Sequence, residues 1–286
     1  MRRLSRRLPV SAAAACLALA LSACGGGSDI TTSVPVGDTI VVTEANQVAS
    51  FNRAAPGTQV GIRAISGLQA GETLAGIDFR PANGLLYALG TRGNLYTLDA
   101  ATGRATFRAT LKAVAGDDNP FTGLLGTQFG VDFNPVADRL RVVSNTGQNL
   151  RINVDTGDVI TDGALTATNE VGAAVAPTAT AAAYTNSFAG ATSTTLYVLD
   201  LTLGLRSVMN PPNDGNLTSA VTLGVVGSGV NGFDLESRTS TGYAAIRSGT
   251  VLSLYRIDLS AAAHAATLLG GIAGVDTVSG LALVQN

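Results

Sequence analysis

Short apolar runs alternate with polar residues along most of the chain, from Thr39 onwards. Glycine, asparagine and aspartate separate these runs, and no stretch keeps its apolar residues at a helical spacing. Alternation with a period of two residues is typical of half-buried β-strands, and the separating residues are those that favour turns. The pattern therefore predicts an all-β domain.

One short phrase returns at regular spacing, and three copies have an aspartate at the third position. The copies are Gly76-Ile77-Asp78-Phe79, Gly130-Val131-Asp132-Phe133, Gly232-Phe233-Asp234-Leu235 and the altered Gly280-Leu281-Ala282-Leu283, with a degenerate copy at Ala183-Tyr184-Thr185-Asn186. Further predicted strands follow each phrase, and glycine-containing turns precede the fourth. Repeats of roughly 50 residues with four antiparallel strands are typical of propeller blades.

The two ends of the repeat array are incomplete in complementary ways. The copy at Gly280 leaves room for one strand only, whereas Thr39–Val42, Gln47–Phe51 and Gln59–Ile65 read as second, third and fourth strands without a first. Pairing the two ends would complete one blade and remove a free sheet edge. We predict a five-bladed β-propeller of four-stranded antiparallel blades over residues 39–286, closed by pairing of the N- and C-terminal strands.

The N-terminal residues read as an export signal. Four arginines precede an apolar run from Val10 to Leu21, which is too short to span a bilayer. The run ends in Leu21-Ser22-Ala23-Cys24, which resembles the lipobox of bacterial lipoproteins. The alternative is an ordinary secretory signal that is cleaved after Ala23 and leaves a free thiol.

The lipobox resemblance implies that residues 1–23 are removed and that Cys24 is acylated. Residues 24–38 are rich in glycine, serine and threonine and would form a flexible tether. We therefore expect an exported protein that is lipid-anchored in the cell envelope, with the membrane as a partner through acylated Cys24. In a Gram-negative host, Gly25 after the cysteine implies the outer membrane.

Charge and missing motifs narrow the function. Without the four signal arginines the chain keeps 14 basic residues against 20 acidic ones, and its arginines are scattered. Nucleic-acid binding needs a basic stripe, so we expect no nucleic-acid partner. His264, the only histidine, lies on a predicted hairpin, which argues against a Ser-His-Asp triad and a multi-histidine metal site. The sequence also has no P-loop, dinucleotide-binding or Gly-x-Ser-x-Gly motif.

Three long phrases resemble the bacterial DUF4394 family. They are residues 68–81, 129–143 and 147–151, which include two copies of the repeated phrase. The resemblance covers residues 39–286. It implies an exported, propeller-like domain without an assigned activity, and it adds no catalytic residue.

The repeated aspartates Asp78, Asp132 and Asp234 are the first candidate site. They take equivalent positions in the strand nearest the axis, where they could converge on Ca²⁺, a cation that takes six to eight oxygen ligands. Several five-bladed propellers with hydrolytic or lactonase activity resemble this plan. Alternatively, each aspartate accepts backbone N–H groups between neighbouring blades. Tyr184 and Ala282 are expected to interrupt the ring, and no cofactor other than Ca²⁺ is implied.

A polar stretch over one predicted hairpin is the second candidate. Its residues could bind a carboxylate or a glycan through bidentate contacts, or tie one blade to the next in an Arg–Asp network. The residues are Arg139, Arg141, Asn145, Gln148, Asn149 and Arg151.

The sequence thus supports two functional hypotheses. The first is a lipid-anchored envelope propeller that acts as a non-enzymatic binding or scaffold module for a protein or glycan. The second is a Ca²⁺-dependent hydrolase or lactonase with a carboxylate site on the propeller axis.

Overall fold

The computed structural model describes residues 32–285 except 169–173 and 230. The proposed signal peptide and Cys24 lie outside the described residues. All regular elements in the described ranges are β-strands. Accordingly, these ranges contain no helix with the length and hydropathy of a membrane span.

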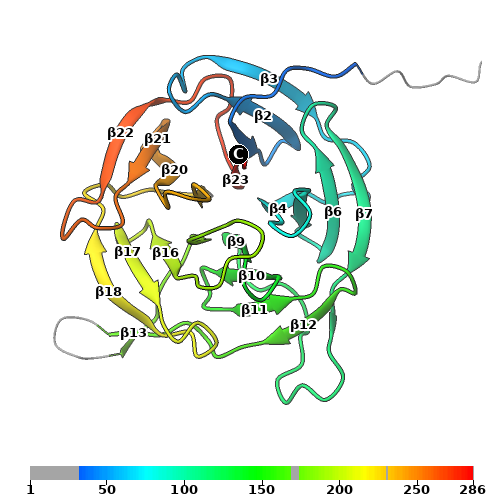
Figure 1. The fold of residues 1–286 in the computed structure, drawn as a ribbon, viewed down its shortest axis with the longest axis vertical. Coiled ribbons are helices and arrows are strands. Elements are labelled where there is room, and N and C mark those ends of the chain that lie inside the picture. Colours follow the sequence, from blue (N-terminus) through cyan, green and yellow to red (C-terminus); the bar gives the residue numbers. More distant parts are fainter. Residues whose placement is uncertain (1–31, 169–173, 230, 286) are drawn as a thin grey trace, which may run out of the picture. The chain divides into compact units, whose positions relative to one another are not determined.

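Five small antiparallel sheets are arranged in a ring, so the protein is a five-bladed β-propeller (Figure 1). Blade 1 consists of β4 (Leu74–Phe79), β5 (Leu86–Gly90), β6 (Asn94–Asp99) and β7 (Arg104–Thr110). Blade 2 consists of β9 (Phe129–Asn134), β10 (Arg139–Ser144), β11 (Asn149–Ile152) and β12 (Asp158–Thr161). Blade 3 consists of β15 (Ala181–Tyr184), β16 (Leu196–Asp200), β17 (Leu205–Met209) and β18 (Leu217–Thr222). Blade 4 consists of β19 (Gly232–Leu235), β20 (Gly242–Ser248), β21 (Val251–Ile257) and β22 (Ala266–Gly271).

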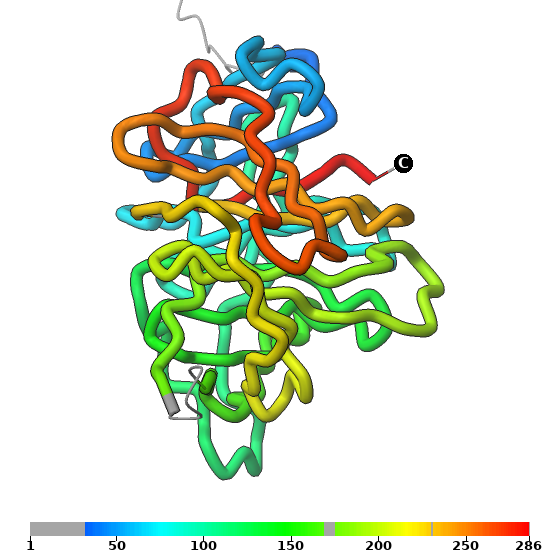
Figure 2. The backbone as a smooth tube through the Cα atoms, turned by 90° about the vertical axis from the view of Figure 1, so that its left-hand side faces the viewer, coloured from blue at the N-terminus to red at the C-terminus, as the bar shows by residue number. Residues whose placement is uncertain are grey.

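Blade 5 joins the two ends of the chain. Its strand order is β23 (Gly280–Leu283), β1 (Thr39–Val42), β2 (Gln47–Phe51) and β3 (Gln59–Ala64). Thr39 pairs with Leu283, and Val42 pairs with Gly280. Figure 2 shows the red C-terminal segment beside the blue N-terminal strands. The predicted closure of the ring is confirmed.

Three short strands lie outside this plan. Strand β8 (Lys112–Ala113) pairs in parallel with β12 and extends the sheet of blade 2. Strands β13 (Ala167–Thr168) and β14 (Ala174–Val175) form a separate two-stranded ladder.

The hydrophobic core lies between adjacent blades. Tyr87 of blade 1 packs edge-on against Phe133 of blade 2, with ring centroids 5.4 Å apart. Buried leucines and valines of the same two blades complete this cluster, and similar clusters fill the other blade interfaces. Because each sheet is covered on both sides by its neighbours, its inner strands are buried on both faces and read as apolar runs.

Residues 32–38, the described end of the proposed tether, lie against the propeller. The amide of Val34 donates to the carbonyl oxygen of Ala101 at 2.9 Å, and the amide of Gly37 donates to the Ser50 hydroxyl at 3.1 Å. Arg63 donates to the carbonyl oxygen of Thr32 at 2.8 Å. This segment is therefore held against blades 1 and 5.

Candidate functional site

The five inner strands β4, β9, β15, β19 and β23 approach each other closely around the axis. A Cβ atom added to Gly76 would lie 2.4 Å from the Val131 side chain, and one added to Gly130 would lie 2.4 Å from the amide nitrogen of Ala182. The repeated phrase therefore needs a glycine at this position, because the next inner strand leaves no room for a side chain. The cavity left between the inner strands is about 10 Å³, which is about the room that one water needs.

The three repeated aspartates do converge. Asp78, Asp132 and Asp234 are each 1% exposed. Each can offer one carboxylate oxygen so that the three oxygens lie within 4.8 Å of one another. Since side chains two residues apart in a strand share a face, each aspartate points to the same side as the glycine of its phrase, toward the next blade.

Each aspartate also binds the inner strand of the next blade. Asp78 accepts the amide of Phe133 at 2.7 Å, Asp132 accepts that of Tyr184 at 2.9 Å, and Asp234 accepts that of Leu283 at 2.7 Å. Asp78 and Asp234 accept a second amide, from the residue that follows each of them. Both expected geometries thus occur together, because the carboxylates link the blades and also meet near the axis.

Blades 3 and 5 have no aspartate at this position of the inner strand, and in blade 3 the residue that takes its place is not the expected one. In blade 3 the residue equivalent to Asp132 is Ala183, because it pairs with the second strand in the same register. Tyr184 instead corresponds to Phe133, whose amide binds the preceding aspartate. The expected role of Tyr184 in interrupting the ring is therefore wrong, and Ala183 and Ala282 interrupt it.

Burial raises the pKa values of all three carboxyl groups. The pKa of Asp234 rises to about 7, against the effect of two backbone amides and Arg53. The pKa of Asp78 rises well above its usual range through burial and the charge of Asp234. For Asp132 burial is again the largest cause, followed by the charges of Asp78 and Asp234. At neutral pH the trio therefore retains protons and carries fewer than three negative charges.

These shifts predict a pH-dependent stability. A free aspartate has a pKa of about 3.9, so between about pH 4 and pH 7 the folded trio binds more protons than the unfolded chain. Stability present at low pH is lost as the pH rises through the folded pKa values. We expect the melting temperature to fall from pH 5 to pH 8 in the presence of a chelator. The Asp132→Asn variant keeps an acceptor for Tyr184 and should show a flatter profile, and an unchanged slope would contradict this assignment.

Arg141, one of the three arginines of the polar stretch on blade 2, is buried in a network between blades. The Arg141 side chain is 2% exposed and forms an ion pair of 2.7 Å with Asp162. It also donates to the Tyr184 hydroxyl of blade 3 at 3.2 Å and to Asn213 at 2.9 Å. This arrangement matches the interpretation of the stretch as a link between blades.

The other residues of this stretch also bind protein groups. Arg151 pairs with Asp162 at 2.6 Å, and Asn149 accepts a hydrogen bond from Arg141 at 2.7 Å. Asn145 and Gln148 accept the amides of Thr127 and Leu125 and so hold the preceding loop. Arg139 donates to the carbonyl oxygen of Asp138. The structure brings Arg141, Asn149 and Arg151 together, but it leaves the remaining three apart from them.

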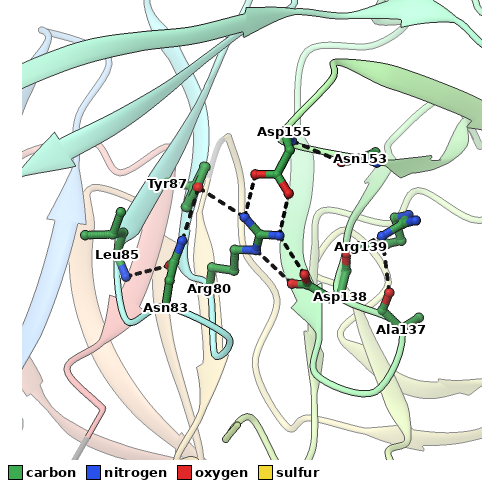
Figure 3. A network of polar contacts seen from close by, with 9 residues as sticks. All are labelled: Arg80, Asn83, Leu85, Tyr87, Ala137, Asp138, Arg139, Asn153 and Asp155. Atoms are coloured by element: carbon green, nitrogen blue, oxygen red, sulfur yellow. Dashed lines mark hydrogen bonds and ion pairs between the residues drawn. The ribbon is translucent and has the colours of Figure 1, made fainter.

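A second arginine network, which the sequence analysis did not identify, fills the gap between blades 1 and 2 (Figure 3). Arg80 is 8% exposed. It binds both oxygens of Asp138 at 2.8 and 2.6 Å and both oxygens of Asp155 at 2.7 and 2.8 Å. It also donates to the Tyr87 hydroxyl at 3.3 Å. We call Arg80, Tyr87, Asp138 and Asp155 the Arg80 plug.

The electrostatics of the Arg80 plug follow from its geometry. The hydrogen bonds that Arg80 donates to Asp138 and Asp155 raise the pKa of Arg80 above its already high value, and the bond that Asp155 accepts from Arg80 lowers the pKa of Asp155. Bidentate pairs of this kind fix orientation as well as distance. The plug therefore locks the connecting loops of blade 2 onto blade 1.

The loops between the first and second strands of the blades, and those between the third and fourth strands, all lie on one end of the propeller. The first and third strands end there, and the second and fourth strands begin there. We call this end the loop face. It carries residues 52–58, 80–85, 100–103, 135–138, 153–157, 185–195, 210–216, 236–241 and 258–265.

The gap between blades 4 and 5 is also closed by an arginine on the loop face. Arg53 forms ion pairs with Glu236 at 2.9 Å and with Asp38 at 3.3 Å. Its guanidinium carbon lies 5.1 Å from the centroid of the Tyr243 ring. Only a small cavity of about 160 Å³ remains beside it.

The other three gaps are open grooves on the loop face. The groove between blades 5 and 1 has a volume of about 620 Å³ and includes the exposed Leu85. The groove between blades 2 and 3 measures about 460 Å³, and the groove between blades 3 and 4 about 560 Å³. Volumes of this size are typical of ligand sites, which span about 300–1,000 Å³.

The fold and its ring of repeated phrases define a five-bladed β-propeller. The chain belongs to the family described as "Domain of unknown function (DUF4394)", whose model matches residues 47–282. No curated protein matches the sequence.

Several solved structures are similar to this chain at low identity. A protein of unknown function from Bacteroides thetaiotaomicron is 14% identical, with a TM-score of 0.46, over 89% of this chain and 65% of that one. This chain therefore spans less than two thirds of that protein. A glutaminyl cyclase from Myxococcus xanthus is 12% identical, with a TM-score of 0.45, over 76% and 87%. A chain of a nidogen/laminin complex is 13% identical, with a TM-score of 0.44, over 87% and 99%. Likeness at this level supports no statement about activity.

Proposed function

We propose that this protein is a binding module of the cell envelope, held to a membrane through acylated Cys24, that recognises a protein or glycan with its loop face. The observation that carries the proposal is the set of three open grooves on that face, beside two equivalent gaps that arginines close. Rigid blades that present loops around grooves form a common kind of recognition surface.

The position of the buried carboxylates supports binding rather than catalysis. The three aspartates are each 1% exposed, so a substrate does not reach them. The axial cavity of about 10 Å³, which the glycine end of the inner strands lines, is also too small to admit a substrate. Within the part of the chain that the structure describes, the lining of the three grooves contains no histidine, cysteine or lysine. The groups that the grooves offer are hydroxyls, amides and a few charges, which suit recognition.

Hydrogen exchange of the full mature chain tests the binding surface. We expect an isolated envelope fraction to slow amide exchange in the peptides of the loop face and to leave the outer strands of the blades unchanged. Protection at the opposite end of the propeller, or no protection at all, would argue against the proposal.

The membrane anchor has a separate test. The Cys24→Ser variant removes the only thiol that the lipobox resemblance assigns to acylation. We expect it to lose the mass of the acyl chains and to move from the membrane fraction to the soluble fraction, because a lipoprotein's stable attachment depends on its acyl chains. The Cys16→Ser variant is the matched control and should remain membrane-bound. Membrane retention of Cys24→Ser would contradict the anchor.

A second candidate function is a Ca²⁺-dependent hydrolase or lactonase. The observation that favours it is the convergence of the three carboxylates within 4.8 Å. Two facts oppose it. Asp78 and Asp234 already accept two backbone amides each, and the three aspartates are each 1% exposed, which keeps a substrate away from them.

Calcium binding separates the two candidates. A cation held by the trio would stabilise the folded chain through mass action. We expect that neither Ca²⁺ nor a chelator changes the melting temperature at pH 8, where the carboxyl groups are most ionised. Stabilisation by Ca²⁺ that the Asp132→Asn variant abolishes would instead favour the axial metal site, and native mass spectrometry would count the bound ions.

A further inference from the structure

The five gaps between blades can be compared residue by residue, because the strand pairing sets a common register. Asp78 pairs with Tyr87 in blade 1, as Ala183 pairs with Tyr197 in blade 3 and Asp234 pairs with Tyr243 in blade 4. Counting from these pairs assigns an equivalent to each member of the Arg80 plug in every gap.

The groove between blades 3 and 4 has uncharged residues at the positions that Arg80, Asp138 and Asp155 occupy in the Arg80 plug. Thr185 stands two residues after Ala183, as Arg80 stands two after Asp78, and Tyr197 takes the place of Tyr87. Ser240 takes the place of Asp138, and the two share a left-handed backbone, with φ values of 55° and 50°. Ser260 takes the place of Asp155. All four equivalents line the groove.

This exchange leaves a cavity where the plug would be. An arginine and two aspartates are replaced by a threonine and two serines, so about 560 Å³ is open between the blades. The tyrosine is kept. Arg206 supports the tyrosine, because its guanidinium carbon lies 5.3 Å from the Tyr197 ring centroid and its Nη1 donates to the Leu259 carbonyl oxygen at 2.8 Å.

The lining of this groove is mainly hydroxyl. Besides the four equivalents it includes Thr239, Thr241, Arg256 and Asp258. Thr239 donates to Glu236, Ser260 donates to Asp258, and Thr185 accepts the amide of Thr195. Among the residues that the structure describes, the Tyr197 hydroxyl, the Ser240 hydroxyl and the Arg256 guanidinium of this lining make no hydrogen bond to other protein groups. The groove therefore offers free donors and acceptors around one supported aromatic ring.

The other open grooves have a different chemistry. In the groove between blades 5 and 1 the equivalents of the plug are Val284, Ile40, Gly84 and Ala101. In the groove between blades 2 and 3 the position of Tyr87 is taken by Arg141, which is buried in its own network. The groove between blades 2 and 3 also contains Tyr184, Ser193, Thr194 and Thr195, but Tyr184 is 1% exposed and its hydroxyl accepts a hydrogen bond from Arg141. The groove between blades 3 and 4 combines hydroxyl walls with a tyrosine that is partly exposed.

We propose that the groove between blades 3 and 4 is a carbohydrate-binding site, an inference that rests on the proposed function and names its ligand class. A sugar ring has an apolar C–H face and a rim of hydroxyl groups. The face packs on the Tyr197 ring, and the rim exchanges hydrogen bonds with the hydroxyl walls, Arg256 and Asp258. A peptide is disfavoured because Ile257 and Leu259 are the only aliphatic side chains in the lining.

The inference predicts that restoring the plug closes the site. The triple variant Thr185→Arg, Ser240→Asp and Ser260→Asp recreates the residues of the Arg80 plug at equivalent backbone positions. Aspartate tolerates the left-handed backbone at position 240, as Asp138 does. A matched control carries the same residue exchanges at exposed sites outside the grooves, as Thr192→Arg, Ser219→Asp and Ser248→Asp.

Calorimetric titration of the full mature chain with cellotetraose, maltotetraose, chitotetraose and tetragalacturonate tests the site. We expect at least one saccharide to bind the native chain and the control, and the plugged variant to bind it at least about tenfold more weakly. The plugged variant should keep or raise the melting temperature, which excludes loss of binding through unfolding. The Tyr197→Phe variant should keep most of the affinity, since it retains the ring.

Two results would overturn the inference. One is that none of the four saccharides binds the native chain, and the other is that binding is equal in the native chain and the plugged variant. The proposed function fails separately, when an envelope fraction leaves hydrogen exchange of the loop face unchanged. Protection of the loop face by an envelope fraction freed of glycans, without saccharide binding, would reject the carbohydrate site and retain the binding module.

Discussion

Replacing Gly130 by alanine is expected to lower the free energy of unfolding by more than about 3 kcal/mol, at or beyond the upper end of ordinary overpacking. The new Cβ atom would lie 2.4 Å from the amide nitrogen of Ala182 and 2.6 Å from the carbonyl carbon of Ala181. Both atoms belong to the backbone of the next inner strand. That strand is itself pressed into a closed ring of five, so it cannot move aside without disturbing its neighbours.

Chemical denaturation measures this effect, with Gly57→Ala as the matched control. Gly57 is exposed, and a Cβ atom there would lie 3.8 Å from its nearest neighbour, which is ordinary van der Waals contact. We expect the control to change the free energy of unfolding by less than about 0.5 kcal/mol. Equal stability of the two variants would show that the inner strands are not packed as described.

Removing the Arg141 side chain is expected to cost about 3–5 kcal/mol of stability, the range for breaking a buried ion pair from one side. The Arg141→Ala variant would leave the Asp162 carboxylate, which is 5% exposed, with Arg151 as its remaining partner. It would also open a cavity at the interface of blades 2 and 3, and the Tyr184 hydroxyl and the Asn213 side chain would lose a donor.

Arg139→Ala is the control for this prediction. Arg139 lies on the same strand two residues earlier, but it is half-buried and donates only to nearby backbone carbonyl groups. We expect a loss below about 0.5 kcal/mol. Similar denaturation midpoints for the two variants would mean that Arg141 is not a structural link between the blades, and would return it to consideration as a ligand-binding residue.

The fold could be predicted because the sequence repeats at several levels. Alternating strands, the glycine-aspartate phrase and the missing first strand at the N-terminus agree on five blades and on closure through blade 5. The register of blade 3 could not be predicted. The run Ala181-Ala182-Ala183 has no glycine or aspartate to set the phase of the phrase, so the sequence alone places Tyr184, instead of Ala183, at the aspartate position.

The candidate sites were harder to predict because they depend on where side chains meet. The alternation of the strand indicates that Asp78, Asp132 and Asp234 share one face. It does not show that on this face each carboxylate contacts the next blade and also lies close to the other two carboxylates. Arg80 follows the repeated phrase directly, yet its partner acids lie 58 and 75 residues further along. Only the register of the finished ring shows that Thr185 is its counterpart.

The ring is fastened where its first and last described strands meet, and this has a consequence for how the chain reaches its native state. Where the other blades have a covalent hairpin, the amide of Val284 donates to the carbonyl oxygen of Asp38 at 3.0 Å. Ser279 and Val42, which meet at the opposite end of the same strand pair, are 237 residues apart in the chain. Contacts of such long range slow folding. Assembly of the circle must therefore wait for β23, and until then the flanks of blades 1 and 4 stay uncovered.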